Sequence, residues 1–166
     1  METSHKTNAV RIVESLGIAH TVVAYQVSEE HLDAETVARQ LGASPDIVFK
    51  TLVAHDDKNQ VAVFCLPANA ELDLKKAARA AGAKSIQLIN LKDLLPLTGY
   101  VRGGCSPIGM KKKYPVFLDE LASLCEKIYI NAGTKGLQIV LAPADLVRIC
   151  EAQLCDVTKS ALSNPS

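Results

Sequence analysis

The sequence predicts a mixed α/β fold: a single α+β domain in which helices flank a mixed, largely antiparallel sheet. Short β-branched runs and short amphipathic runs follow one another without strict alternation. This order argues against a doubly wound parallel sheet and favours antiparallel pairs. A length of 166 residues suits one domain. Because 48% of the residues are hydrophobic and 22% are charged, a substantial core is available.

Capping residues and terminal glycines delimit the predicted helices. Asp33 and Asp73 are suitable N-caps for segments 34–41 and 74–81, and Gly42 and Gly82 end them. Three further helical segments are expected at 7–16, at 90–95 as a capped turn, and at 143–151. Residues 95–110 are expected to be irregular, beginning at Leu95-Pro96.

Aliphatic and β-branched runs predict the strands. The polar run 55–59 predicts a hairpin turn between strands 48–54 and 61–66. A second tight turn at 133–136 is expected to join strands 128–131 and 137–141. The other expected strands are 20–25, 85–88, 116–118 and 154–157. The domain is expected to cover residues 1–159, followed by a polar tail over 160–166.

Composition restricts the kind of partner. The 18 basic and 18 acidic residues give a formal net charge of zero, whereas proteins that follow long stretches of phosphate backbone carry a basic excess. Aromatic residues make up only 4%, which excludes a platform of stacked bases. A nucleic-acid contact is therefore expected to be local: a small basic patch and a pocket for one terminal nucleotide.

The cysteines indicate neither disulfides nor a metal centre. Their number is odd and no pair has CxxC spacing. No signal region or membrane-length apolar run is present in the sequence. We therefore expect a reduced, soluble, cytoplasmic protein without a metal or other cofactor. The five cysteines are Cys65, Cys105, Cys125, Cys150 and Cys155.

A glycine-rich run at 100–109 is the most informative local feature. Three glycines and a proline lie within the seven residues 103–109. Glycine permits positive φ and close approach of a ligand to the backbone, so successive N–H groups could form an oxyanion hole or an anion-binding concavity. An ordinary connecting loop explains the same residues. The run matches neither the GxxxxGK[ST] phosphate loop nor the dinucleotide GxGxxG motif.

Lys50 interrupts an apolar strand. Alternation puts it on the same face as Val48 and Leu52. A lysine in this setting either extends to the rim or sits in a pocket, where its ammonium would recognise a phosphate, a carboxylate or a developing oxyanion. The turn within 131–138 could form one wall of such a pocket.

Together these segments resemble the YbaK/prolyl-tRNA synthetase editing-domain superfamily. The matching motifs are FKTLV at 49–53, GGCSPIG at 103–109 and NAGTKGLQI at 131–139. The resemblance covers nearly the whole chain and is to the free-standing members, because no part of it looks like a synthetase body. It implies a curved sheet and trans-editing hydrolysis of the ester of a mischarged aminoacyl-tRNA, most often tRNA for proline carrying cysteine or alanine.

The resemblance also implies roles for individual residues. Lys50, Gly103 and Gly104 are the expected catalytic residues. The expected substrate-binding residues are Tyr25, Thr51, Cys105, Ser106, Pro107, Gly109, Asn131, Ala132 and Gly133. The chain departs from the family at Asn131-Ala132-Gly133 and at Gln26-Val27-Ser28, which leaves the preferred amino acid open.

The run Lys111, Lys112 and Lys113, with Arg102 before the glycines, is the candidate tRNA contact. A solvated charge run is the alternative interpretation. The expected partner is aminoacyl-tRNA for proline, with prolyl-tRNA synthetase as a further candidate, and the chain is expected to be a monomer.

The favoured mechanism uses little acid–base chemistry of the protein. Cys105 could be a nucleophile, but no histidine stands near it in the sequence. The resemblance to YbaK-like enzymes implies instead that the thiol of the esterified cysteine attacks its own carbonyl. For alanine a bound water would replace it, and in both cases backbone donors are expected at the oxyanion. Two alternatives stay open: a deacylase for Ala, Ser or Thr esters, and a non-catalytic module that binds a nucleotide or aminoacyl-adenosine and regulates a synthetase.

Overall fold

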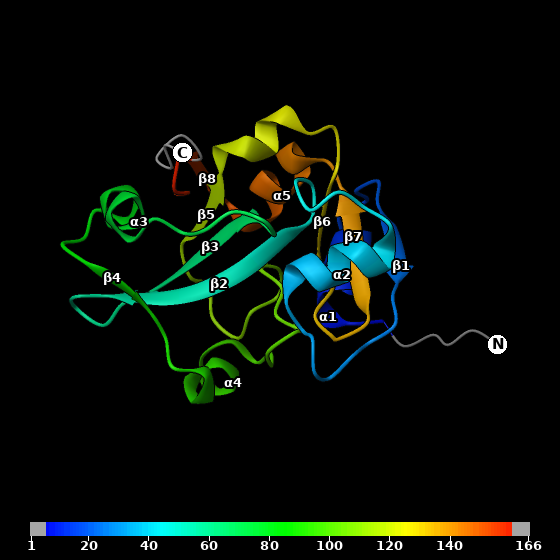
Figure 1. The fold of residues 1–166 in the computed structure, drawn as a ribbon, viewed down its shortest axis with the longest axis horizontal. Helices are drawn as coiled ribbons and strands as arrows, with labels where there is room; N and C mark the ends of the chain where they lie inside the picture. Colours follow the sequence, from blue (N-terminus) through cyan, green and yellow to red (C-terminus); the bar gives the residue numbers. More distant parts are fainter. Residues whose placement is uncertain (1–5, 161–166) are drawn as a thin grey trace, which may run out of the picture.

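Two sheets carry the strands of the computed structural model, which describes residues 6–160 (Figure 1). The smaller sheet has the order β1 (Thr21–Ala24), β7 (Leu137–Leu141), β6 (Ile128–Asn131). The larger has the order β4 (Ile86–Leu88), β2 (Phe49–Asp56), β3 (Val61–Pro67), β5 (Val116–Asp119), β8 (Gln153–Cys155). Only the β3–β5 and β5–β8 pairs are parallel, so the prediction of a mixed, largely antiparallel sheet is confirmed for the pairing.

The two sheets meet at one point, where the single predicted sheet is interrupted. Val48 forms an isolated parallel bridge with Tyr129 of β6, and the Tyr129 N–H donates to the Ile47 carbonyl at 2.9 Å. Beyond this bridge β2 leaves β6 and pairs with β3 and β4. The prediction of one sheet was therefore wrong, because the strand with Lys50 changes partners.

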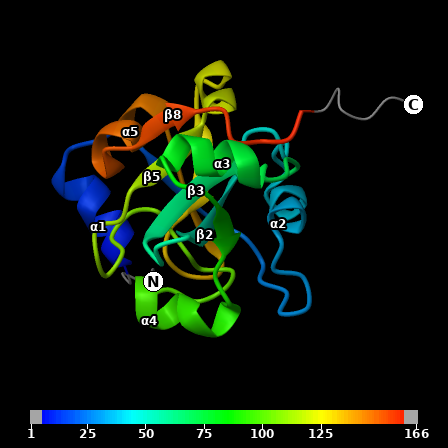
Figure 2. The ribbon, with the colours of Figure 1, turned by 90° about the vertical axis from the view of Figure 1, so that its left-hand side faces the viewer.

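Helices cover both sides of the strands. Figure 2 shows α1 and α5 on one side and α2 on the other. The five α-helices of the described residues are α1 (Asn8–Ser15), α2 (Ala34–Leu41), α3 (Leu74–Ala81), α4 (Leu94–Thr98) and α5 (Pro143–Cys150). No helix within residues 6–160 is long and apolar enough to cross a bilayer.

The helix caps follow the sequence. The Asp33 carboxylate accepts from the Thr36 N–H at 3.0 Å, and that of Asp73 accepts from the Lys75 and Lys76 N–H groups at 3.0 Å each. Gly42 and Gly82 end α2 and α3 in the left-handed conformation. The bounds predicted for these two helices are confirmed.

Pro96 lies inside a helix, contrary to the predicted start of an irregular stretch. A 3-10 turn (Leu91–Asp93) leads directly into α4, and Asn90 makes no side-chain cap bond. Pro96 is the third residue of α4, where a backbone N–H would have no partner within the helix, so the proline costs no hydrogen bond. A second 3-10 helix (Glu120–Leu124), not predicted, follows β5.

Two buried clusters form most of the core. One gathers around α1, β6, β7 and α5 and includes Val13, Ile130, Ile139 and Leu146. The other lies between the larger sheet and α3, where the rings of Phe64 and Phe117 stack with centroids 5.2 Å apart. A third, smaller cluster of Ala38, Val48 and Ala68 lies at the junction of the two sheets, and Val48 and Ala68 also line the cavity described below.

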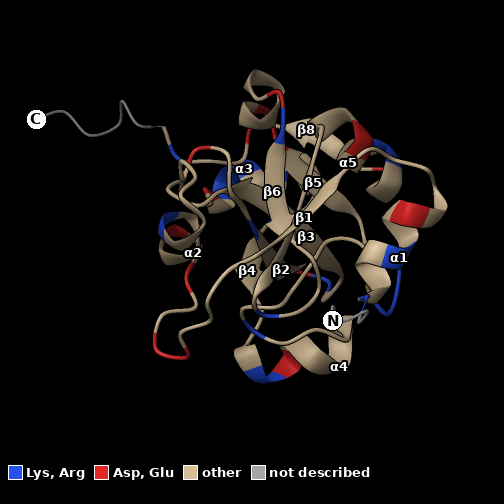
Figure 3. Cartoon of the chain, turned by 90° about the vertical axis from the view of Figure 1, so that its right-hand side faces the viewer, with Lys and Arg blue, Asp and Glu red and all other residues tan. Residues whose placement is uncertain are grey.

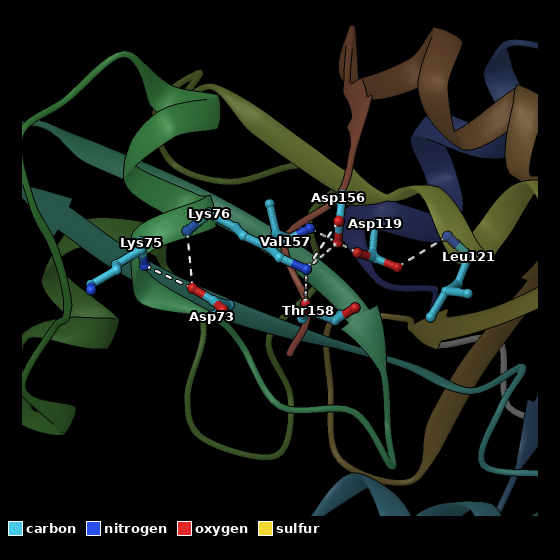
Figure 4. Close-up of polar contacts among 8 residues, drawn as sticks. All are labelled: Asp73, Lys75, Lys76, Asp119, Leu121, Asp156, Val157 and Thr158. Carbon is cyan, nitrogen blue, oxygen red and sulfur yellow. Dashed lines mark hydrogen bonds and ion pairs between the residues drawn. The ribbon is translucent and has the colours of Figure 1, made fainter. Parts of the chain in front are cut away.

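A buried carboxylate fixes the chain beyond β8 (Figure 4). Asp119 is fully buried, and its two oxygens accept from the N–H groups of Val157 and Leu121 at 3.0 Å each. Lys76 reaches across from α3 to Asp156 at 3.0 Å and to the Thr158 carbonyl at 2.8 Å. These bonds satisfy the buried charge and tie the chain end to α3 and β5. Residues 161–166 of the predicted polar tail lie outside the described residues.

Candidate active site

A cavity of about 290 Å³ lies where the two sheets meet. Its walls come from the start of β2, the N-terminal part of α2 with the residues before it, the glycine loop (residues 100–109), and strands β6 and β7. Seven of the predicted site residues line it, from four separate parts of the chain: Tyr25, Lys50, Thr51, Arg102, Gly103, Cys105 and Asn131.

Lys50 is held half-buried in this cavity. Its ammonium donates to the Ala68 carbonyl at 3.2 Å. Burial lowers the pKa of Lys50 below its ordinary value of 10.5, while the nearby carboxylates of Glu35, Glu71 and Asp33 partly oppose the shift. The lysine thus sits in the pocket, as one of the two sequence interpretations held, and supplies a cation in a partly desolvated setting.

The glycines allow the loop to approach other parts of the chain closely. Gly103 has φ +82°, and a Cβ there would lie 3.1 Å from the Leu32 side chain. A Cβ on Gly104 would lie 3.1 Å from the backbone of both Thr134 and Lys135. The loop is therefore packed against the β6–β7 turn and the residues before α2, which fixes the backbone facing the cavity.

Asn131 connects the two turns that meet at the cavity. Its Nδ2 donates to the Gly103 carbonyl at 2.9 Å, and its Oδ1 accepts from the Gly133 N–H at 2.7 Å. One side chain therefore fixes both the glycine loop and the β6–β7 turn. This bond pattern gives Asn131 a positioning role for the loop, at a position where the sequence departs from the family pattern.

The other predicted loop residues do not line the cavity. Ser106 is buried and its hydroxyl accepts from the Ile108 N–H at 3.2 Å, which orders the turn. Gly109 and Gly133 pack closely on Tyr100. Three more predicted residues, Gly104, Pro107 and Ala132, also lie outside the cavity lining. Beside them the Tyr100 hydroxyl donates to the Ile108 carbonyl. These residues shape the loop behind the cavity.

The predicted basic contact is divided. Arg102 is exposed and lines the cavity, whereas Lys111, Lys112 and Lys113 line a separate depression with Pro107 and Gly109. All three lysines are exposed, and Lys113 pairs with Glu151 at 2.7 Å. Figure 3 shows basic and acidic residues interspersed along the ribbon on the side it presents. The lysine run therefore lies apart from the cavity, at a depression that the same glycine loop borders.

Cys105 has a thiol rather than a thiolate at neutral pH. Burial raises its pKa to about 12. Within residues 6–160 no histidine lines the cavity that could remove its proton. The same described residues contain no cluster of three or more His, Cys, Asp or Glu side chains that could hold a metal ion.

Sequence reasoning missed two walls of the cavity. One is formed by Leu32, Asp33, Ala34, Glu35 and Val37, which only the docking of α2 brings to Lys50. The other includes Gln138, which is 4% exposed. A lone amide in the apolar run 137–141 was the available signal, since an uncharged polar residue inside a buried strand needs a partner.

Comparisons with known proteins give the same family as the three motifs. The model of the aminoacyl-tRNA editing domain matches residues 28–149. EbsC of Enterococcus faecalis, a proposed Cys-tRNA(Pro)/Cys-tRNA(Cys) deacylase, is 45% identical over 157 residues, which are 95% of this chain and 96% of EbsC. A proline–tRNA ligase of Shouchella clausii is 28% identical over 74% of this chain and 21% of the ligase.

Solved structures agree with this result. The crystal structure of a proposed trans-editing enzyme for prolyl-tRNA synthetase superposes with a TM-score of 0.79 and 25% identity. The match covers 94% of this chain and 100% of that structure. The family model and the relatives match most of the sequence, including the three motifs. The chain therefore belongs to the aminoacyl-tRNA editing domain family.

Proposed function

We propose that this chain removes cysteine from mischarged tRNA for proline, acting in trans. As a member of an aminoacyl-tRNA editing family it is a deacylase. The observation that carries the substrate assignment is the cavity with the Lys50 ammonium on one side and the fixed glycine loop on another. Its volume of about 290 Å³ is small for a ligand pocket, which suits a small aminoacyl group.

Lys50 binds and orients the substrate in this proposal. Its ammonium faces the ester or the phosphate of the terminal adenosine, since a partly desolvated cation attracts either oxygen strongly. The backbone N–H of Gly103 is the proposed donor to the oxyanion. Gly104, predicted as a second donor, is buried outside the cavity lining and donates its N–H to the Val101 carbonyl at 2.9 Å, so in this proposal it holds the turn. Tyr25, Thr51 and Cys105 border the aminoacyl group, and the remaining predicted residues of the loop and of the β6–β7 turn hold this donor in place.

The chemical step uses the substrate's own thiol. The cysteinyl sulfur attacks the ester carbonyl, a C–S bond forms, and the C–O bond to the ribose breaks. The thiol proton passes, directly or through water, to the departing ribose oxygen. The products are a cyclic thiolactone and tRNA with a free terminal hydroxyl; water then opens the thiolactone to cysteine. The thiol-form Cys105 and the absence of a cavity histidine within residues 6–160 support a mechanism of this kind.

The tRNA contact is local in this proposal. Arg102 at the cavity and Lys111, Lys112 and Lys113 beyond it contact phosphates near the acceptor end. The chain acts as a monomer in the cytoplasm, with residues 1–159 as the working domain. Prolyl-tRNA synthetase is the proposed partner that presents the tRNA, a view supported by the resemblance to the synthetase editing domain.

The test is deacylation of tRNA for proline charged separately with Cys, Ala and Pro. We expect rapid loss of Cys, slower loss of Ala and no loss of Pro. Lys50→Ala should lower kcat/KM for the cysteinyl ester by about a hundredfold or more, as expected for loss of a charged, oriented contact. Lys75→Ala, which removes an exposed lysine from α3, is the matched control and should leave the rate unchanged.

Other outcomes separate the alternatives. Preference for Ala, Ser or Thr esters would assign the same site to another amino acid. Stoichiometric binding of aminoacyl-tRNA without turnover would favour the regulatory binding module. Full activity of the Lys50→Ala enzyme would contradict the site itself.

A further inference from the structure

Gln138 is a buried polar side chain that the proposed mechanism leaves without a role. Its Oε1 is the one buried side-chain nitrogen or oxygen in residues 6–160 that lacks a hydrogen-bond partner. The residue is 4% exposed and lines the same cavity as Lys50. An unpaired buried acceptor destabilises the folded chain, so its presence at a cavity wall calls for a donor from a ligand.

The strand register places Gln138 beside another cavity residue. In the smaller sheet it lies opposite Asn131 of β6, and opposite residues of an antiparallel pair face the same side. Val48 forms an isolated bridge with Tyr129 of β6, and β2 leaves β6 beyond it. Lys50 and Gln138 therefore line the cavity from strands of two different sheets, β2 and β7.

We propose that Gln138 Oε1 accepts a hydrogen bond from the α-ammonium group of the aminoacyl ester. This inference rests on the proposed deacylase function and adds the subsite for the amino group. An amide oxygen can only accept. Of the donors on a cysteinyl-adenosine, the thiol is weak, and the ribose hydroxyl and the adenine amino group are neutral, whereas the ammonium makes the strongest bond.

The charge of Lys50 favours this orientation. Lys50 repels a second cation, so the ammonium belongs at the β7 wall, away from Lys50, with the ester carbonyl between them. The carboxylates of Asp33 and Glu35 act on Lys50, where they favour its charged form. Gln138 is then a positioning residue: it fixes the rotation of the aminoacyl group relative to the glycine loop. It also disfavours esters without a free ammonium, such as peptidyl-tRNA.

The first experiment measures binding, independently of turnover. The probes are two stable amide analogues of charged adenosine: 3′-cysteinylamino-3′-deoxyadenosine and its counterpart from 3-mercaptopropionic acid, which keeps the thiol but lacks the α-amino group. Wild type should bind the cysteinyl analogue about ten- to a hundredfold more tightly, the range for a hydrogen bond to a charged group. Gln138→Met, similar in volume but without the acceptor, should reduce this preference to near unity.

The matched control is Gln153→Met, at an exposed glutamine of β8, which should keep the wild-type preference. A thermal scan without ligand gives an independent readout. Because the empty site leaves Oε1 unpaired, Gln138→Met should unfold at the same temperature as wild type or higher. A wild type that binds both analogues equally, or a methionine variant that keeps the preference, would overturn the proposal.

Kinetics then separates this proposal from the proposed function. If wild type hydrolyses Cys-tRNA(Pro) and Gln138→Met keeps both its rate and its rejection of the mercaptopropionyl ester, the amino-group subsite is wrong and the deacylase stands. If wild type hydrolyses no ester yet shows the analogue preference and its loss in the variant, the subsite stands and the deacylase fails.

Discussion

Cys105 offers a direct test of the chemistry at the scale of single residues. Its pKa of about 12 leaves it protonated at neutral pH, and it therefore lacks the thiolate that a covalent mechanism needs. We expect Cys105→Ala to retain kcat/KM for the cysteinyl ester within about fivefold, because it removes packing rather than a nucleophile. Single-turnover deacylation measures this. A drop of a thousandfold, or a trapped acyl-enzyme, would instead establish Cys105 as the nucleophile.

The titration of Lys50 is a second prediction for one residue. Burial lowers its pKa, so the folded chain releases this proton at a lower pH than the unfolded chain, whose lysine keeps the value of 10.5. Between the two values the unfolded state binds more protons, and this group alone therefore makes folding stability rise with pH. An NMR titration of the lysine Cε signals should show Lys50 titrating below 10.5. Adenosine monophosphate should raise its pKa, since a bound anion favours the charged form.

At the residue scale, the sequence indicated cavity-lining residues where a local rule applies. A charge in an apolar strand and clustered glycines are unusual by themselves, and Lys50 and Gly103, which these signals indicated, line the cavity, while their catalytic roles stay predictions. Gln138 was equally visible in the run 137–141, yet the sequence does not reveal whether a buried amide finds a partner. That depends on Asn131 and Val23, its neighbours across the sheet.

At the scale of helices and strands, the sequence predicted an element where the residues at its own ends determine it, and failed where distant contacts do. An aspartate cap and a terminal glycine predicted α2 and α3, because both ends of each helix depend on residues within it or next to it. Pro96 misled the prediction since a proline in a first turn and a proline that ends a helix look alike until the helix start is known. The separation into two sheets depends on where β2 leaves β6, which no pattern in β2 indicates.

Gly104→Ala tests how two elements fit together, the glycine loop and the β6–β7 turn. Gly104 lacks a left-handed φ, so the effect is steric: the new Cβ would lie 3.1 Å from the backbone of Thr134 and Lys135. We expect a decrease of about 1–3 kcal/mol in the free energy of unfolding, together with a fall in kcat/KM. Urea denaturation and deacylation assays measure the two effects.

Gly17→Ala is the control for this substitution. Gly17 has φ +68° and open space around the Cβ position. The variant should be less stable by about 1 kcal/mol, the cost of a side chain in the left-handed region, and keep full activity. Equal activity in both variants would show that the loop does not need its contact with the turn.

For the whole molecule, net neutrality together with a local lysine run makes a prediction about salt. Replacing Lys111, Lys112 and Lys113 by Ala should weaken tRNA binding and reduce the slope of log K against log salt concentration, by about 0.7–0.9 for each phosphate that is no longer neutralised. An aminoacyl ester of adenosine alone, without the rest of the tRNA, should still be hydrolysed by this variant, because the cavity is unchanged. Fluorescence anisotropy with labelled tRNA at several salt concentrations measures the slope.

A charge-matched variant with Lys58, Lys84 and Lys92 replaced by Ala is the control for net charge. These lysines are exposed and lie outside both depressions that the loop borders. Equal slopes in the two triple variants would show that Lys111, Lys112 and Lys113 form a solvated charge run and do not contact tRNA phosphates.

The strand β8 has a consequence for how the protein is made. It pairs with β5, a strand whose four residues are all buried, and it comes from the last part of the described chain. During synthesis, β5 therefore keeps one open, apolar edge until residues 153–155 have left the ribosome. An exposed edge of this kind recruits strands from other chains. Premature termination before residue 153 should therefore yield aggregates, and chaperones that shield nascent chains should matter most during this interval.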